Sequence, residues 1–205
     1  MIPCYWTQAA EELSASDPLM AGLVARYPGV SLVSRGDPFC TLARSIVGQQ
    51  ISVKAADSVW SRFVSVVGAV TPGRVAELGR EGLEGCGLSK RKIEYLADLA
   101  GHFLSGQLAP AGWAAHDDEA IIAELVAVRG IGRWTAEMFL IFNLMRPDVF
   151  PLDDIGLQRA IFLRYFNGEK QPRRAISAFG ERWRPWRSVA TWYLWRSLDP
   201  VPVAY

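Results

Sequence analysis

The 205-residue sequence has few residues of the types on which metal and nucleophilic sites usually depend. Its three cysteines, Cys4, Cys40 and Cys86, are far apart and odd in number, so they indicate neither a disulfide framework nor a C-x-x-C metal site. His102 and His116 are the only histidines, which argues against a zinc site and against a histidine-based catalytic triad. We therefore expect a reduced, intracellular protein.

Long uncharged apolar runs are also lacking. None approaches the roughly 18 residues of a membrane span. The first 25 residues hold three acids and no Lys or Arg, unlike a secretory or transit peptide. Half of the residues are hydrophobic and 21% are charged, which excludes a disordered chain. The sequence predicts a globular protein with no membrane contact.

Apolar residues recur at helical spacing along nearly the whole chain, and alternating strand patterns are absent. The fold class expected is therefore all-α. Asp37, Ser52 and Ser89 precede helical segments as N-caps, and 71–73 is expected to be a turn that closes the second helix. Later helices are expected from Asp117 or Asp118, over 133–145, over 155–166 and from Pro185.

The net charge of +1 argues for no particular partner, but the charge is unevenly distributed. Between Arg159 and Arg196 there are nine cations and two acids, a net charge of +7, interleaved with four tryptophans. Such a segment suits phosphates and stacked bases. A solvated helix face over buried tryptophans is the alternative interpretation.

Two glycines flank one aliphatic residue between helical patterns, in Gly130-Ile131-Gly132. Such a turn lets another backbone approach closely, and the unpaired amides of the next helix can bind one DNA phosphate without reading base sequence. The carbonyl groups of Val126, Val128 and Ile131 could hold a monovalent cation. An ordinary turn between helices, with a C-cap glycine, is the alternative.

An acidic pair follows twenty residues after Trp134, at Asp153-Asp154. One helix out and one extended connector back could return Asp154 to a cleft near the hairpin. Because Asp153 can serve as the helix cap, we expect Asp154 to face a substrate.

Five segments in order resemble the helix-hairpin-helix DNA glycosylase superfamily, in its alkylation-repair branch, the DNA-3-methyladenine glycosylase II family. They lie at residues 42–53, 87–92, 128–136, 148–154 and 183–188. The resemblance implies two helical domains with the active site in the cleft between them. Residues 37–149 would form the central domain with the hairpin, and residues 1–36 would join 150–205 in the second.

By this resemblance Asp154 is the catalytic aspartate. A purine methylated at N3 or N7 is cationic and leaves as a neutral base, so the difficult species is the sugar oxocarbenium ion, which a fixed carboxylate stabilises. Asp154 could also orient or deprotonate the attacking water. Trp134 stands where bifunctional relatives carry a nucleophilic lysine, which implies hydrolysis without strand cleavage. No cysteine follows Cys86, which excludes the iron–sulfur loop of some relatives, so no cofactor is required beyond a structural Na+ or K+ at the hairpin.

The resemblance assigns the remaining site residues as well. Trp134 and Trp195 match positions that line the base pocket, where indole faces favour a cationic purine, and Met138 stands where some relatives have tyrosine. Gln50 and Ile51 match the wedge that fills the gap left by a flipped base, although the Gln-Gln pair could be a polar connector. The phosphate-binding residues are expected to be Gly130, Gly132, Thr135 and Arg187, with Lys90, Arg91 and Lys92 either binding phosphate or forming a solvated turn.

The expected function is a monofunctional glycosylase that releases alkylated purines, such as 3-methyladenine and 7-methylguanine, from duplex DNA. The expected partner is duplex DNA containing damaged bases, and we expect a monomer in the cytoplasm, associated with the nucleoid if bacterial. A glycosylase for deaminated purines such as hypoxanthine, and a non-catalytic DNA-binding hairpin module, are the alternatives.

Overall fold

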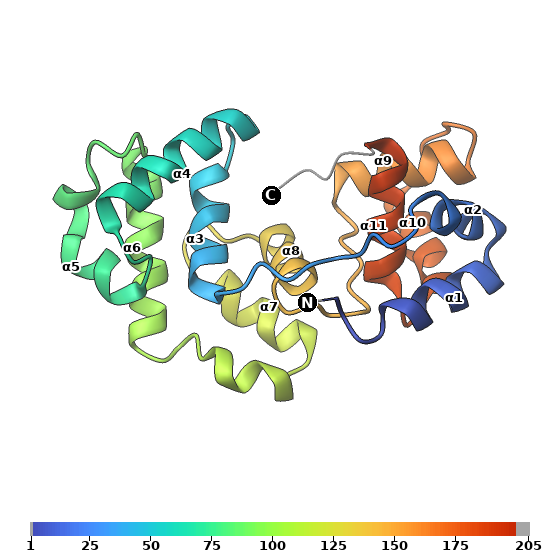
Figure 1. The fold of residues 1–205 in the computed structure, drawn as a ribbon, viewed down its shortest axis with the longest axis horizontal. Helices are drawn as coiled ribbons and strands as arrows, with labels where there is room; N and C mark the ends of the chain where they lie inside the picture. The colour runs from blue at the N-terminus through green and yellow to red at the C-terminus, as the bar shows by residue number, and fades with distance from the viewer. Residues whose placement is uncertain (1, 200–205) are drawn as a thin grey trace. The chain divides into compact units, whose positions relative to one another are not determined.

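The computed structural model describes residues 2–199, and these residues fold entirely as helices and connecting loops, with no strand among them (Figure 1). The all-α prediction is confirmed. The elements are α1 (Trp6–Ser16), α2 (Pro18–Arg26), α3 (Pro38–Gly48), α4 (Val53–Val67), α5 (Pro72–Leu83), α6 (Lys90–Leu104), η1 (Pro110–Ala115), α7 (Asp118–Val126), α8 (Arg133–Phe142), α9 (Ile155–Tyr165), α10 (Arg173–Gly180), η2 (Glu181–Trp183) and α11 (Arg187–Leu198).

The described chain divides into two compact units. The central unit comprises residues 35–139, and the terminal unit comprises residues 2–34 together with 140–199. The division expected from the resemblance placed residues 37–149 together, whereas 140–149 lie in the terminal unit. Hydrogen bonds explain this: Tyr5 donates its hydroxyl to the Met145 carbonyl at 2.7 Å, and the Val149 amide donates to Ser188 Oγ at 2.9 Å.

In the terminal unit, helix α11 is packed against α1, α2 and α9. It is almost wholly buried, and its aromatic residues pack with others of the unit, as Trp192 does edge-on against Trp6. A buried carboxylate ties the amino-terminal helices to this core: Asp17 caps α2 and also accepts hydrogen bonds from Tyr165 and Trp183. Residues far apart in sequence therefore form one core.

In the central unit, α3 packs against α4 and α6, and α5 packs against α4 and α6 (Figure 1). The expected caps are confirmed: Asp37, Ser52 and Ser89 accept hydrogen bonds from backbone amides in the first turns of α3, α4 and α6. The prediction for 71–73 was wrong, because Thr71 is itself an N-cap and Pro72 begins α5. A Thr-Pro pair starts a helix as readily as it makes a turn.

Other boundaries differ in smaller ways. Helix α8 ends at Phe142, earlier than expected, and α11 begins at Arg187 rather than Pro185. None of the helices in residues 2–199 combines the length and the apolar character needed to cross a membrane.

Candidate functional site

The predicted hairpin is present: α7 ends at Val126, residues 127–132 form the turn, and α8 begins at Arg133. Gly130 has a φ of +88°, in the region that favours glycine. A Cβ atom at this position would overlap the ring of Tyr95, on α6. Gly130 is therefore required both for the turn and for its close packing on α6. Gly132 is exposed, and a Cβ there would meet no atom within 4 Å.

Side chains from two other elements hold the turn in place. The Arg129 amide donates to Asp98 Oδ2, on α6, at 2.8 Å. The Gly130 carbonyl accepts a hydrogen bond from Gln49 Nε2, in the α3–α4 loop, also at 2.8 Å. The hairpin is thus braced by α6 and by the loop that was predicted to carry the wedge.

Arg133, directly after the second glycine, joins the two helices of the hairpin. Its guanidinium pairs with Glu119 of α7 and, at 3.0 Å, with Glu137 one turn along α8. Glu137 is buried, and the hydrogen bond to Glu119 is the main reason that the pKa of Arg133 lies above its ordinary value. Arg133 therefore stabilises the hairpin from within.

The carbonyl groups expected to hold a monovalent cation lie at the last residue of α7, Val126, and in the turn, at Val128 and Ile131. The Val128 carbonyl accepts the Ile131 amide at 3.1 Å, which uses one of its two lone pairs. Carbonyl oxygens are suitable ligands for Na+ or K+, so the donor chemistry fits such an ion. The cation site stays a prediction.

A pocket of about 650 Å³ lies within the central unit, beside the hairpin. It is lined by the end of α3, the α3–α4 loop and the beginnings of α4, α6 and α8. Six of the predicted site residues line it: Gln50, Ile51, Gly130, Trp134, Thr135 and Met138.

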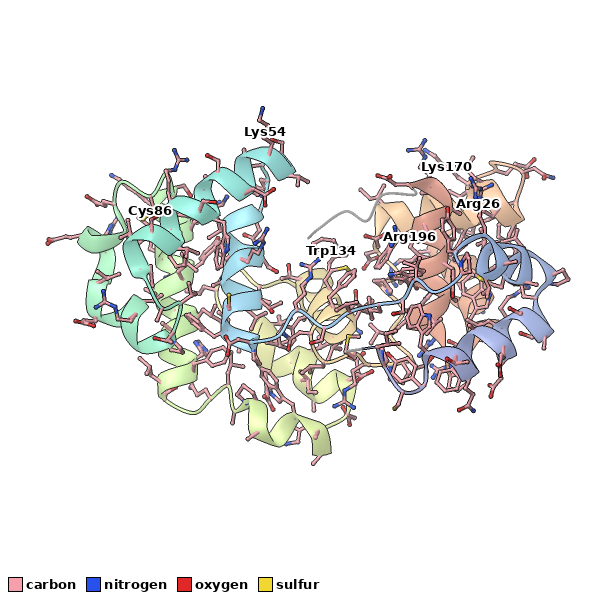
Figure 2. The ribbon with its side chains drawn as sticks, viewed as in Figure 1. Arg26, Lys54, Cys86, Trp134, Lys170 and Arg196 are labelled. Carbon is pink, nitrogen blue, oxygen red and sulfur yellow. The ribbon has the colours of Figure 1, made fainter. Side chains whose placement is uncertain are left out.

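Trp134 stands in the first turn of α8 and is 37% exposed, so part of its indole is open to a ligand (Figure 2). Met138, one turn later, is 5% exposed and forms an inner part of the wall. Thr135 is buried as well. Two of the three residues predicted to hold the damaged base, Trp134 and Met138, thus share one wall of the pocket, whereas Trp195 is not among its lining residues.

The two glutamines of the α3–α4 loop lie differently. Gln49 donates to the hairpin, whereas Gln50 is exposed and has a φ of +59°. Ile51 is 40% exposed, although it is a large apolar residue. An exposed Gln-Ile tip on an anchored loop suits the predicted wedge.

The cations at the beginning of α6 differ as well. Lys92 donates Nζ to the Val47 carbonyl at the end of α3, at 2.8 Å, and burial lowers its pKa. Arg91 is exposed and lines the pocket, and Lys90 is exposed. Lys92 has a structural partner, whereas Lys90 and Arg91 lie in the first exposed turn of α6.

The acidic pair lies in the terminal unit, and the helix cap is not the acid that was expected. Asp154, not Asp153, is the N-cap of α9: its Oδ1 accepts the Leu157 amide at 2.6 Å. Asp153 is exposed and pairs with Arg173 at 2.8 Å. Capping nevertheless suits the predicted role, because the cap fixes Asp154, which is only 6% exposed, at the positive end of a helix.

Trp195, on α11, contacts the same carboxylate. Its indole Nε1 donates to Asp154 Oδ1 at 2.8 Å, and its ring stacks on Phe142 with centroids 5.8 Å apart and an interplanar angle of 10°. The predicted base-pocket residue is therefore a direct partner of the predicted catalytic acid.

Arg187, which was expected to bind phosphate, is paired with acidic residues of the terminal unit, and its phosphate role stays a prediction. Its Nε and Nη2 atoms bind the two carboxylate oxygens of Asp148 at 2.7 and 3.0 Å, and Nη1 binds Glu181 at 3.1 Å. Only 14% of its side chain is exposed. With each guanidinium nitrogen bound to an acidic residue, Arg187 is a structural ion-pair partner.

Three residues that support the site were not singled out from the sequence: Gln49, Tyr95 and Asp98. Gln49 was grouped with the wedge loop, without a partner. Tyr95 and Asp98 lie on α6, and the helical spacing of its apolar residues does not indicate that these two side chains contact the hairpin. The sequence contains one signal for these contacts. A glycine at position 130 permits close packing, which indicates that another part of the chain packs against the turn.

Comparison with known proteins identifies the relatives. Residues 43–185 match the model of the HhH-GPD superfamily of base excision DNA repair proteins. The chain is 31% identical to the DNA-3-methyladenine glycosylase 1 of Schizosaccharomyces pombe over 93% of this chain and 87% of that protein. It is 32% identical to the putative DNA-3-methyladenine glycosylase YfjP of Bacillus subtilis, over 88% of this chain and 66% of that protein, slightly under two thirds of its length.

Solved structures agree. A crystal structure of DNA-3-methyladenine glycosidase from Bacillus halodurans is 35% identical, with a TM-score of 0.86, over 93% of this chain and 89% of that one. The S. pombe 3-methyladenine DNA glycosylase in complex with abasic DNA is 30% identical, with a TM-score of 0.78, over 96% of this chain and 100% of that one. These likenesses confirm the resemblance to the alkylation-repair branch, and the chain belongs to the HhH-GPD superfamily of base excision DNA repair proteins.

Proposed function

We propose that the chain is a monofunctional DNA glycosylase that hydrolyses the N-glycosidic bond of alkylated purines, of the 3-methyladenine and 7-methylguanine type, in duplex DNA. The observation that carries the proposal is Asp154, a buried carboxylate fixed by the first turn of α9 and by the Trp195 indole. The names of the relatives support the substrate class.

The reaction needs charge stabilisation more than acid catalysis. An N3- or N7-methylated purine already carries a positive charge, so it leaves as a neutral base when the glycosidic bond breaks. The positive charge then remains on the sugar, as an oxocarbenium ion. A carboxylate held in advance stabilises that charge without reorganising during the reaction. Water adds to the sugar, Asp154 orients it or takes its proton, and an abasic site results.

The pocket beside the hairpin distinguishes alkylated purines from normal bases. We assign the flipped base to Trp134 and Met138, because an electron-rich indole attracts a cationic purine more strongly than a neutral one, by about 0.5–2 kcal/mol. The exposed Gln50 and Ile51 fill the space left in the duplex. The amides at the start of α8 bind one phosphate, through the backbone around Gly132.

The same assignment predicts hydrolysis without strand cleavage. A glycosylase that also cuts the strand forms a Schiff base through an amine, and Trp134 occupies the position where bifunctional relatives carry that lysine. Asp154 offers no amine. We propose that the protein acts as a monomer on cellular DNA and needs no cofactor, apart from a structural Na+ or K+ at the hairpin.

The test is single-turnover release of base from a methylated duplex by the wild type and by Asp154→Asn. The amide keeps nearly the same shape and can still accept from Leu157 and Trp195, but it carries no charge. We expect base release by the wild type, with an intact strand until the abasic site is cleaved by alkali. We expect at least a hundredfold loss in Asp154→Asn, with binding to an abasic duplex retained.

The outcomes separate the alternatives. Equal rates in both proteins would remove Asp154 from the mechanism. Release of hypoxanthine but not of methylated purines would favour a glycosylase for deaminated bases. Binding of DNA by folded protein without release of any base from a lesion panel would favour a non-catalytic hairpin module.

A further inference from the structure

Two elements of the terminal unit supply hydrogen-bond donors to the Asp154 carboxylate. Asp154 Oδ1 accepts two N–H donors, the Leu157 amide at 2.6 Å and the Trp195 indole at 2.8 Å. The first comes from the helix that Asp154 caps, and the second comes from α11, forty-one residues further along the chain. The carboxylate is therefore oriented from two elements.

The indole itself is held in place. Its ring stacks nearly parallel on Phe142, at the end of α8. Gly156 lies close to the contact: a Cβ at residue 156 would lie 3.2 Å from Asp154 Oδ1 and 3.4 Å from the Trp195 atoms Cδ1 and Nε1. A glycine in the first turn of a helix normally costs stability. Here it leaves space for the hydrogen bond.

We propose that Trp195 is a positioning residue for the glycosylase reaction, whose indole N–H fixes the Asp154 carboxylate in the orientation used for catalysis, with Gly156 supplying the space for this contact. The role differs from that of a wall of the base pocket, because it depends on the N–H group and not on the ring face. The inference rests on the proposed function.

The physical reason is the geometry of a carboxylate. The helix amide fixes the position of one carboxylate oxygen, but one donor restrains rotation about the Cβ–Cγ bond less than two donors do. The Trp195 indole, a second donor on a different element, restrains that rotation further. Electrostatic stabilisation depends on groups that are oriented before the charge develops. Loss of the second donor should therefore slow base release more than it weakens DNA binding.

The first experiment uses Trp195→Phe, which keeps an aromatic ring but removes the N–H donor. We expect its single-turnover rate on methylated duplex to fall by about 10- to 100-fold, while its affinity for an abasic duplex changes less than about threefold. Trp192→Phe is the matched control. It removes an indole from the same helix, but the ring of Trp192 packs against Trp6. Its rate should stay within about threefold of the wild type.

The second experiment is a double-mutant cycle with Asp154→Asn. If Trp195 acts through Asp154, then Trp195→Phe should slow the wild type strongly but have little further effect in the Asp154→Asn background. An independent role in the base pocket predicts the same fold-loss in both backgrounds. Additive effects would overturn the proposal even if Trp195→Phe is slow.

The third variant, Gly156→Ala, tests the same contact with a substitution that is not expected to unfold the protein. Alanine is the better helix former, so helix propensity alone should not lower the thermal stability of this variant. Its Cβ should crowd the Asp154–Trp195 contact and lower the rate of base release. A full rate in Gly156→Ala and Trp195→Phe, with an active wild type that depends on Asp154, would overturn the inference and leave the proposed function standing. An inactive wild type would count against both.

Discussion

The Gln49 side-chain amide donates to the carbonyl oxygen of Gly130 at 2.8 Å, although the two residues are 81 positions apart in sequence. One residue belongs to the loop that carries Gln50 and Ile51, and the other to the glycine turn of the hairpin. The two DNA-contacting loops proposed for the central unit are thus joined by one hydrogen bond.

Substitutions at Gln49 and Gln50 should distinguish the structural role of Gln49 from the proposed wedge role of Gln50. In Gln49→Met the side chain keeps its length but cannot donate to Gly130. We expect unfolding free energy to fall by about 1 kcal/mol, with faster hydrogen exchange in residues 49–51 and 128–132. Gln50→Ala is the matched variant, since Gln50 is exposed. It should unfold like the wild type but release base more slowly, and a stability loss equal to that of Gln49→Met would contradict the distinction.

The two hairpin glycines should respond differently to alanine. Gly130→Ala places a Cβ into the Tyr95 ring at a positive φ. It should destabilise the protein by about 2–4 kcal/mol, so this variant tests the fold before it tests DNA binding. Gly132→Ala meets no atom within 4 Å and should fold normally.

Gly132→Ala is therefore the clean probe of phosphate contact. It should weaken binding to duplexes of different sequence by a similar factor, because a phosphate contact carries no sequence information. Fluorescence anisotropy with several duplexes at one salt concentration measures this. Weakening confined to one sequence would argue against a backbone–phosphate contact at Gly132.

Substitution of Arg187 should lower stability without changing the salt dependence of DNA binding, and substitution of Arg91 should do the reverse. In Arg187→Met, Asp148 loses its bidentate partner in a partly buried site, and we expect unfolding free energy to fall by about 1–3 kcal/mol. The salt dependence of DNA binding should not change. Arg91→Ala, at an exposed position on the pocket rim, should leave stability unchanged and lower the slope of log affinity against log salt by about 1. The reverse result would restore Arg187 as a phosphate ligand.

Alkaline pH should destabilise the terminal unit through Tyr5. Burial, with a smaller contribution from Cys4, raises the pKa of Tyr5 to about 12. Because the ordinary pKa is about 10, this contribution to stability is fully present below pH 10 and is lost as the pH rises towards 12. Urea unfolding at pH 8 and pH 11.5 measures the loss. Tyr5→Phe should be less stable at pH 8, since Tyr5 donates to the Met145 carbonyl, but should lose less stability at high pH. Equal losses in both proteins would contradict this assignment.

The amino-acid sequence by itself determined the helical class, the caps at Asp37, Ser52 and Ser89, the glycine hairpin and the family. These features depend on local spacing and capping chemistry, which a short segment already contains. Only the tertiary structure decided which acid caps α9, that Trp195 donates to Asp154, that Gln49 braces the hairpin and that Arg187 is bound by Asp148. The cap is local, but either of two adjacent acids could supply it. The other three contacts join residues from different elements, and whether a polar side chain meets another residue or the solvent depends on where packing places the second element.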